Sequence, residues 1–309
     1  MIYDVAVIGL GCAGYTAAIY AARYKLTVLL IGAEEGGLGN TAAEVGNWPG
    51  EIEIRGPELM EKFKHHAQSF ENVMQKIARI EKAERMDGGF RLTMDDGSVA
   101  EAKTLVIATG SSKRHLGVPG EKEFSGKGVT YCATCDAFFY KGKTVAVIGG
   151  GDSAVEGAAI AAQVAKTVYL VHRRKEFRAE PYWVDRVKAR ENIIPVLERT
   201  ITEIRGDQRV TSVRLDQPFN GADELVVDGV FIEIGATPAV ALGQQLGCAL
   251  DDKGFLQVDA GMQTTVPGVF GAGDVTSGSN HFAQFTTAAG EGAIAANSVF
   301  SYLQGASHA

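Results

Sequence analysis

Short apolar runs that end in glycine turns, each followed by an alanine-rich stretch, dominate the hydrophobic pattern of the chain. Residues 5–14 read VAVIGLGCAG, and residues 145–154 read VAVIGGGDSA. At the same offset, TVLLI at 27–31 matches TVYLV at 167–171. Apolar runs of this length predict buried strands, and the alanine-rich segments between them predict helices. The pattern therefore predicts a strand–turn–helix–strand unit that occurs twice.

Each glycine turn has the spacing of a dinucleotide-binding loop. The matching positions are Gly9, Gly11 and Gly14 in the first copy and Gly149, Gly151 and Ala154 in the second. Such residues supply a tight turn, a close approach to a pyrophosphate and close helix–strand packing, and the following helix N-terminus favours phosphate. One such motif is a weak signal, but two at one offset favour two dinucleotide sites over plain loops.

The two copies differ after their second strand, where a dinucleotide presents its adenosine ribose. The first copy continues GAEE, in which Glu34 is the candidate acid, and the second continues His172, Arg173 and Arg174, with Arg178 following. A carboxylate suits the free 2′-hydroxyl of FAD or NAD, and guanidinium groups suit the 2′-phosphate of NADPH. The alternative for each set is a solvated charged face.

Two further apolar segments support a flavin site. TLVIATG at 104–110 and VFGAGD at 269–274 read as short strands that end in small residues. Asp274 then precedes an alanine-rich segment that predicts a helix over 286–299. This aspartate suits either a ribityl hydroxyl of a flavin or the N-terminal cap of that helix.

The segment YCATCDAFFY at 131–140 contains two of the four cysteines. A zinc site needs about four ligands, and the remaining Cys12 and Cys248 are far apart in apolar or turn contexts that predict packing. A structural disulfide between Cys132 and Cys135 would close almost no loop. A CxxC at a helix start has a lowered thiol pKa. The segment therefore predicts a redox pair and no metal.

Length and charge narrow the class of protein. A chain of 309 residues predicts two domains, and a net charge of −7 argues against nucleic acid as a partner. Apolar runs stay below the roughly 18 residues of a membrane span, and Met1 leads directly into the first strand. We therefore expect a cytoplasmic protein without membrane attachment.

Together these motifs resemble the low-molecular-weight thioredoxin reductases over essentially the whole chain. The matching segments are the first glycine turn, NWPG (47–50), ATG (108–110), CATCD (132–136), GGGDSA (149–154), HRR with Arg178, GATP (235–238) and GAGD (271–274). The resemblance implies an α/β fold of two Rossmann-like, three-layer ββα dinucleotide-binding domains. The NADPH domain, which carries the redox pair, would span 116–242 and interrupt an FAD domain formed by 1–115 and 243–309.

The resemblance also implies an activity. Electrons would pass from NADPH through FAD to the disulfide of Cys132 and Cys135, and from there to the disulfide of thioredoxin or a thioredoxin-like protein. Cys135 would face the flavin, Cys132 would attack the partner, and Asp136 would act as the general acid and base. A homodimer is expected on the same ground. Phe138, Phe139 and Tyr140 are expected to pack.

Individual cofactor contacts follow from the matching positions. For FAD they are Gly9, Gly11, Gly14, Glu34, Gly36, Gly37, Asn47, Thr109, Gly110, Gly273, Asp274, Gln284 and Phe285. For NADPH they are Gly149, Gly151, Asp152, Ser153, Ala154, His172, Arg173, Arg174, Arg178 and Ile234. The chain departs from the family at Cys12, at residues 38–40, at Ala137 and at Ala283, and the departures at 38–40 and 283 fall where the family binds flavin.

Three alternatives stay open at this point. The same chemistry with a ferredoxin donor predicts loss of the arginine set, which is present. A dedicated glutaredoxin-like or peroxiredoxin partner in place of thioredoxin would be chosen by the surface around Cys132. A non-catalytic flavoprotein that binds a dinucleotide would need both cysteines to be inert.

Overall fold

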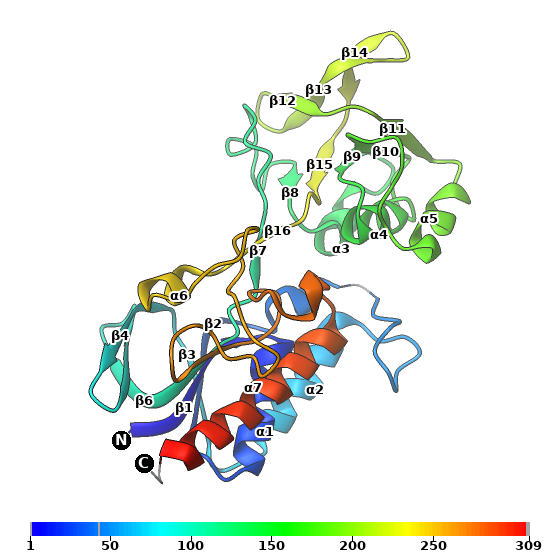
Figure 1. Ribbon diagram of the computed structural model, residues 1–309. Coiled ribbons are helices and arrows are strands. Elements are labelled where there is room, and N and C mark those ends of the chain that lie inside the picture. Colours follow the sequence, from blue (N-terminus) through cyan, green and yellow to red (C-terminus); the bar gives the residue numbers. More distant parts are fainter. Residues whose placement is uncertain (1, 43, 307–309) are drawn as a thin grey trace. The chain divides into compact units, whose positions relative to one another are not determined.

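The computed structural model of the protein describes residues 2–42 and 44–306, which form two compact units (Figure 1). Unit 1 contains the chain up to Ser112 and again from Pro238, and unit 2 contains Lys113–Thr237. Unit 2 is therefore inserted into unit 1. The crossing segments are β7 (Ser111–Lys113) and β16 (Ala236–Pro238), which pair as a two-stranded sheet close to the expected boundaries at 115 and 242.

Unit 1 is built on a seven-stranded sheet of order β3-β2-β1-β6-β5-β4, with β17 also paired to β6. The strands are β1 (Ile2–Leu10), β2 (Val28–Glu35), β3 (Val73–Ile77), β4 (Ile80–Met86), β5 (Gly89–Met94), β6 (Val99–Ile107) and β17 (Val269–Gly271). Strands β1, β2, β3, β6 and β17 are parallel. Their carboxyl ends therefore share one edge of the sheet, the edge at which such sheets bind ligands.

Helices cover one face of this sheet. The helices of unit 1 are α1 (Cys12–Arg23), α2 (Gly56–Gln68), α6 (Ala241–Gln245) and α7 (Phe285–Ala306). Helices α1, α2 and α7 lie together (Figure 1), and Tyr15 and Phe270 are fully buried in the core that joins α1 and α7 to the sheet. Helix α7 runs beyond the predicted end at 299. In the described part of the chain, no helix is long and apolar enough to cross a membrane.

Unit 2 repeats the arrangement on a five-stranded parallel sheet of order β11-β10-β9-β15-β8. Its elements are β8 (Val129–Thr130), α3 (Ala133–Asp136), β9 (Thr144–Ile148), α4 (Asp152–Ala161), β10 (Thr167–His172), α5 (Pro181–Lys188), β11 (Ile193–Leu197) and β15 (Gly229–Ile232). On β9, Val145 and Val147 pack toward α4, whereas Ala146 and Ile148 pack on the opposite face. Apolar side chains at every position are expected of a strand that is covered on both sides.

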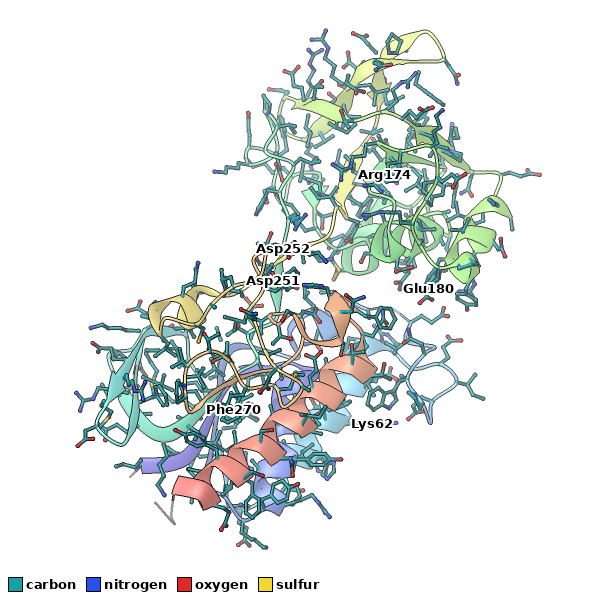
Figure 2. The ribbon with its side chains drawn as sticks, in the orientation of Figure 1. Lys62, Arg174, Glu180, Asp251, Asp252 and Phe270 are labelled. Carbon is teal, nitrogen blue, oxygen red and sulfur yellow. A yellow bond between two sulfur atoms is a disulfide. The ribbon has the colours of Figure 1, made fainter. Side chains whose placement is uncertain are left out.

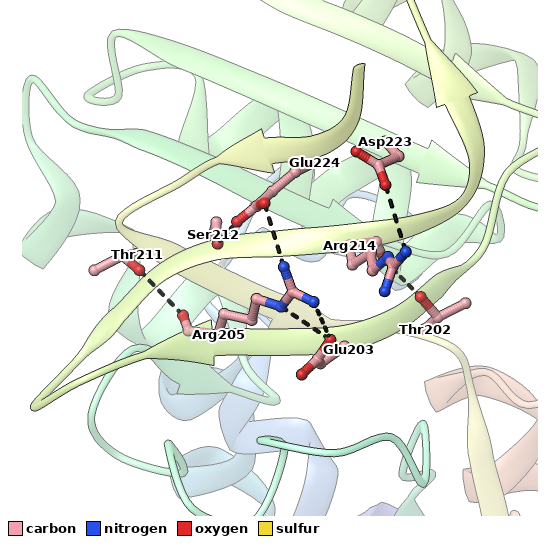
Figure 3. A network of polar contacts seen from close by, with 8 residues as sticks. All are labelled: Thr202, Glu203, Arg205, Thr211, Ser212, Arg214, Asp223 and Glu224. Atoms are coloured by element: carbon pink, nitrogen blue, oxygen red, sulfur yellow. Dashed lines mark hydrogen bonds and ion pairs between the residues drawn. The ribbon is translucent and has the colours of Figure 1, made fainter. Parts of the chain in front are cut away.

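The opposite face of the unit 2 sheet is covered by a second, antiparallel sheet. Its strands are β12 (Ile201–Gly206), β13 (Val210–Phe219) and β14 (Ala222–Val226). The outward face of this small sheet carries a polar network (Figure 3), in which Arg205 contacts Glu203 at 2.7 Å and Glu224 at 3.4 Å. Arg214 contacts Asp223 at 3.6 Å in the same network.

The predicted repeat is present in the structure. Helix α1 begins at Cys12 and α4 begins at Asp152, each directly after its glycine turn. Strands β1 and β2 are parallel neighbours, as are β9 and β10. The prediction of two strand–turn–helix–strand units is therefore confirmed.

The contact between α1 and α7 yields a stability prediction. A Cβ atom at Gly292 would lie 2.3 Å from the carbonyl oxygen of Ala13, whereas one at Gly290, on the same helix, meets nothing within 4 Å. Gly292→Ala should therefore destabilise the fold by about 1–3 kcal/mol through overpacking. Gly290→Ala, the matched control, should stabilise it by about 0.5–1 kcal/mol through helix propensity. Urea denaturation midpoints measure both, and equal midpoints would contradict the close contact.

Candidate active site

The glycine turn of unit 1 is shaped by its own backbone. Gly9 has a φ of +126°, and a Cβ atom there would lie 2.0 Å from the carbonyl oxygen of Ala108. A Cβ atom at Gly14 would lie 1.9 Å from the carbonyl oxygen of Gly9, but Gly11 has nothing within 4 Å. The first and third glycines are thus required by packing. The middle glycine opens onto free space at the start of α1, which fits a diphosphate.

The turn of unit 2 has the same construction. Gly149 has a φ of +144°, and a Cβ atom there would lie 2.2 Å from the carbonyl oxygen of Glu233. Gly151 again has nothing within 4 Å. Ala154 and Ser153 lie in the first turn of α4, as expected from the sequence. The second turn therefore also leaves room for a phosphate at a helix N-terminus.

Backbone contacts hold the arginine segment beside this second turn. The Arg178 N–H donates to the Gly150 carbonyl oxygen at 2.6 Å. The Glu180 N–H donates to the Asp152 carboxylate at 2.7 Å. Arg173, Arg174 and Arg178 are all exposed, and Figure 2 labels Arg174 and Glu180 in unit 2. The three predicted arginines therefore lie where their side chains can reach a phosphate beyond the glycine turn. The Asp152 carboxylate holds the backbone of their segment in place.

His172 lies at the end of β10, against the glycine turn. A Cβ atom at Gly150 would lie 2.3 Å from its Nδ1. The ring is buried, and its Nε2 has no hydrogen-bond partner among the described residues. Burial lowers the pKa of His172, and the charges of the neighbouring arginines lower it further. The buried ring therefore packs against the turn, and the three arginines of this segment lie exposed beside it.

The predicted FAD residues of unit 1 gather at the carboxyl edge of its sheet. The Asn47 side-chain N–H donates to the Gln284 side-chain oxygen at 3.0 Å, and the Thr109 hydroxyl donates to the Ala239 carbonyl oxygen at 2.7 Å. The start of α7 is Phe285, whose carbonyl oxygen accepts from the Cys12 thiol at 3.3 Å. These contacts join segments 47, 109, 239 and 284–285 around the start of α1.

At the end of β2, the glutamate that contacts other side chains is Glu35 and not the predicted Glu34. Glu34 and Glu35 are both exposed. Glu35 is the one in contact with other side chains, since it pairs with Lys64 at 3.0 Å and accepts from Gln75 at 2.8 Å. Gly36 and Gly37 follow with positive φ values of 75° and 51°. This leaves Glu34 in solvent beside the turn, available to a ribose but not positioned by any hydrogen bond that we observe.

The departure at residues 38–40 is accommodated by a short turn. A 3₁₀ helix (Gly37–Thr41) carries Asn40, whose amide donates to the Glu35 carbonyl oxygen at 2.8 Å. A Cβ atom at Gly36 would lie 2.3 Å from that amide oxygen, so the Asn40 side chain closes over the glycine. The altered residues thus preserve a tight turn after β2.

Asp274 lines a hollow at the end of β17. The residues around it are Phe255, Gly273, Asp274, Thr276, Gly278, His281, Phe282, Ala283, Thr287 and Glu291. Burial raises the pKa of Asp274, and the nearby Glu291 carboxylate raises it further. Because α7 starts only at Phe285, the alternative of Asp274 as its N-terminal cap is wrong. The contact of Asp274 with a flavin therefore stays a prediction.

The redox pair forms a disulfide at the start of α3. Cys132 and Cys135 are joined, with their Cα atoms 5.3 Å apart, and Cys135 is the more exposed of the two. Cys132 caps the helix, because its sulfur accepts the Cys135 N–H at 3.2 Å. An N–H directed at the sulfur favours the thiolate over the thiol once the disulfide is reduced.

Thr130 connects Asp136 with the redox pair. Its hydroxyl donates to the Asp136 carboxylate and accepts the Cys132 N–H at 3.3 Å. The Thr130 side chain therefore links the Asp136 carboxylate to the backbone N–H of Cys132. This geometry suits a group that exchanges a proton near the sulfurs.

The aromatic residues after the redox pair correct one expectation. They form a 3₁₀ helix (Ala137–Tyr140) in which Ala137 is buried and Tyr140 stacks edge-on against Phe231 at 5.2 Å. Phe138 and Phe139 instead expose 74% and 73% of their surface. The expectation that both phenylalanines pack is wrong, because the three-residue period turns only Ala137 and Tyr140 inward.

Cys12 and Cys248 lie in the cores of unit 1, as predicted. Burial raises the pKa of Cys12 to about 12, with a further contribution from Asp274. Burial also raises the pKa of Cys248. Both thiols therefore stay protonated at neutral pH and are poor nucleophiles, in contrast to the pair on α3.

Sequence reasoning missed two side chains beside the redox helix. Glu233 accepts the Ala133 N–H at 3.1 Å and pairs with Lys113 at 2.9 Å. The signal for Glu233 was available, because a lone acid in the apolar run GVFIEIG must be paired when it is buried. No pattern pointed to Lys113, which lies 120 positions away along the chain. Ile234, the predicted contact next to Glu233, packs at the edge of the unit 2 core.

Comparison with known proteins places this geometry in a family. The chain matches the pyridine nucleotide-disulphide oxidoreductase family over residues 3–292. It is 44% identical to a glucosaminate ammonia-lyase of Pseudomonas fluorescens, over 99% of this chain and 97% of that protein. It is 43% identical to a thioredoxin reductase of Escherichia coli O157:H7, over 97% of this chain and 95% of that protein.

Solved structures agree with the sequence relatives. The thioredoxin reductase of Lactococcus lactis has a TM-score of 0.92 at 35% identity and covers 98% of this chain and 99% of its own. That of T. acidophilum has a TM-score of 0.90 at 38% identity, covering 97% and 98%. The predicted fold class, two Rossmann-like units with one inserted into the other, is confirmed. The chain belongs to the pyridine nucleotide-disulphide oxidoreductase family, on the branch that holds the low-molecular-weight thioredoxin reductases.

Proposed function

We propose that this protein is an NADPH-dependent flavoprotein that reduces the disulfide of thioredoxin. The observation that carries the proposal is the Cys132–Cys135 disulfide, which lies in the same unit as a glycine turn flanked by exposed arginines. The thioredoxin reductases among its relatives support the choice of partner. The residue assignments for both cofactors, made from the sequence, fit the turns described above and are part of the proposal.

The chain's own residues have separate tasks. Arg173, Arg174 and Arg178 bind the 2′-phosphate of NADPH, and the open side of Gly151 admits its pyrophosphate. Gly11 does the same for FAD in unit 1. FAD, when bound, supplies a two-electron carrier between NADPH and the disulfide. Hydrogen bonds among Asn47, Gln284, Thr109 and Ala239 hold the segments around that site.

Exchange with the partner uses the reduced pair. The Cys132 thiolate attacks one sulfur of the partner disulfide, and the other partner sulfur leaves as a thiolate that takes a proton from Asp136. Cys135 then passes its proton to the Asp136 carboxylate and attacks the Cys132 sulfur, from which the second partner sulfur leaves as a thiolate. This second step re-forms the Cys132–Cys135 disulfide and releases the partner with both of its sulfurs reduced. The Thr130 hydroxyl holds Asp136 in place for the proton transfer.

Exposed aromatic side chains beside the pair suit a protein partner. Phe138 and Phe139 follow the disulfide by three and four residues and expose most of their surface. Exposed neighbouring phenyl groups mark surfaces that bind other proteins. They support a protein disulfide, rather than a small dithiol, as the substrate.

The arginine set favours NADPH over a ferredoxin donor. A ferredoxin-flavin thioredoxin reductase of Clostridium acetobutylicum is a more distant structural relative, with a TM-score of 0.55 at 30% identity and full coverage of both chains. An exposed cationic set beside an open glycine turn is what a phosphorylated dinucleotide needs. The homodimer and the cytoplasmic location rest on the family and the composition, and they stay predictions.

Turnover tests the proposed function directly. The FAD-loaded protein should oxidise NADPH in the presence of oxidised thioredoxin, and Cys135→Ser should lower kcat by about 10³-fold or more, because the disulfide cannot re-form. Cys248→Ala, which removes a buried thiol of unit 1, should keep the activity. Ammonia release from glucosaminate should be absent. Full activity in Cys135→Ser, or ammonia release without thioredoxin reduction, would contradict the proposal.

Donor choice tests the arginine assignment. Arg173→Ala combined with Arg174→Ala should raise KM for NADPH by about 100-fold or more, since each of the two lost charge-assisted hydrogen bonds contributes about 1.5–3 kcal/mol. KM for NADH should change little. Arg205→Ala with Arg214→Ala removes the same charge from the outer sheet of unit 2 (Figure 3) and serves as the control. Equal effects of the two double variants would show that only the net charge of unit 2 matters.

A further inference from the structure

An ion pair between the buried Glu233 and the partly exposed Lys113 lies beside the redox helix. Glu233 follows β15, is 7% exposed, and donates its N–H to the Ile148 carbonyl oxygen at 2.9 Å. Its Oε2 contacts the Lys113 ammonium at 2.9 Å. Burial raises the pKa of Glu233, and Lys113 opposes that effect. The Lys113 ammonium therefore stabilises the ionised form of this carboxylate.

The other carboxylate oxygen is bound to the redox helix. Oε1 of Glu233 accepts the Ala133 N–H at 3.1 Å. Ala133 is the first residue of α3, and Cys132 is its N-cap. The ion pair is therefore one peptide unit away from the residue that carries the first sulfur of the disulfide.

Packing fixes this contact from both sides. A Cβ atom at Gly157 of α4 would lie 2.7 Å from the Ala133 Cβ, so α3 lies tightly against α4. A Cβ atom at Gly149 would lie 2.2 Å from the Glu233 carbonyl oxygen. Glu233 thus joins the glycine turn, the redox helix and Lys113 of β7. The Glu233 backbone and the redox helix are therefore each held in place by close packing.

We propose that Glu233, balanced by Lys113, is a positioning residue that sets the reduction potential of the Cys132–Cys135 disulfide. Reduction adds two electrons and two protons to the disulfide and yields two thiols, one of which then releases its proton to become a thiolate. A nearby negative charge disfavours that thiolate and a positive charge favours it. The neutral pair holds the two effects in balance, so removing either charge shifts the equilibrium between disulfide and dithiol.

The proposal deepens the proposed function and rests on it, but its test does not need thioredoxin. Glu233→Gln keeps an acceptor for the Ala133 N–H and leaves the Lys113 charge unopposed. It should favour the dithiol by about tenfold at equilibrium with dithiothreitol, which is about 30 mV for a two-electron couple. Acid quenching, alkylation and mass spectrometry of the peptide that contains Cys132 and Cys135 report the reduced fraction.

Three further variants separate a tuning role from a structural one. Lys113→Gln combined with Glu233→Gln removes both charges and should return the equilibrium to within about threefold of the unmodified protein. Glu203→Gln removes a carboxylate from the outer sheet (Figure 3) and should have no effect. If Glu233→Gln does not fold, Lys113→Gln alone must shift the equilibrium toward the disulfide, because it leaves the carboxylate without its counter-charge.

Each result decides the proposal. A lowered unfolding midpoint in Glu233→Gln with an unchanged reduced fraction would assign Glu233 a purely structural role and overturn it. Equal shifts in Glu233→Gln and the double variant would show that Lys113 is not the opposing charge, and would also overturn it. Loss of thioredoxin reduction in the unmodified protein would refute the proposed function while leaving the measured potentials interpretable.

Discussion

The close approach of backbone to backbone at the two glycine turns is the constraint on which the rest of the structure depends. Gly9 and Gly149 each lie so near a neighbouring carbonyl oxygen that a Cβ atom would come within 2.0 Å and 2.2 Å of it. Those carbonyl groups belong to Ala108 and Glu233, which follow β6 and β15. Each turn is therefore locked to the next strand of its sheet, and each helix N-terminus is held at the same edge. At the start of each helix, Gly11 and Gly151 face open space, since a Cβ atom there would meet nothing within 4 Å.

The glycine turn of unit 2 is also connected to the redox helix, through Glu233. The same short segment that receives Gly149 also supplies the Glu233 side chain to the redox helix. The Gly150 carbonyl oxygen and the Asp152 carboxylate accept hydrogen bonds from the backbone of the segment that carries Arg178. The pieces needed to bind a phosphorylated donor and to hold a reactive disulfide are thus parts of one small packed unit. This arrangement explains how a 125-residue insertion, Lys113–Thr237, can carry two chemical tasks.

Local motifs predicted the fold class and the disulfide, because each motif depends on residues that are close in sequence. The repeat of 5–14 at 145–154, the CxxC and the HRR segment each predicted the element and the place that the structure shows. The features that the sequence did not predict depend on contacts between residues far apart in the chain or on the local period of a helix. The Glu233–Lys113 pair joins positions far apart in the chain, and the exposure of Phe138 and Phe139 follows from a 3₁₀ turn that composition does not reveal. The sequence allowed Asp274 either to contact a flavin or to cap the following helix, and the start of α7 at Phe285 excludes the cap.

The most direct test of the account is to trap the covalent intermediate with the partner. The central claim is that Cys132 attacks, although Cys135 is the more exposed residue. The Cys135→Ser and Cys132→Ser variants would each be mixed with a thioredoxin that has one active-site cysteine, activated as its thionitrobenzoate disulfide, and analysed by intact-mass spectrometry. The account predicts a stable adduct with Cys135→Ser, formed at least about tenfold faster than with Cys132→Ser, since the capped Cys132 sulfur is the better thiolate. Equal or faster trapping by Cys132→Ser would contradict it.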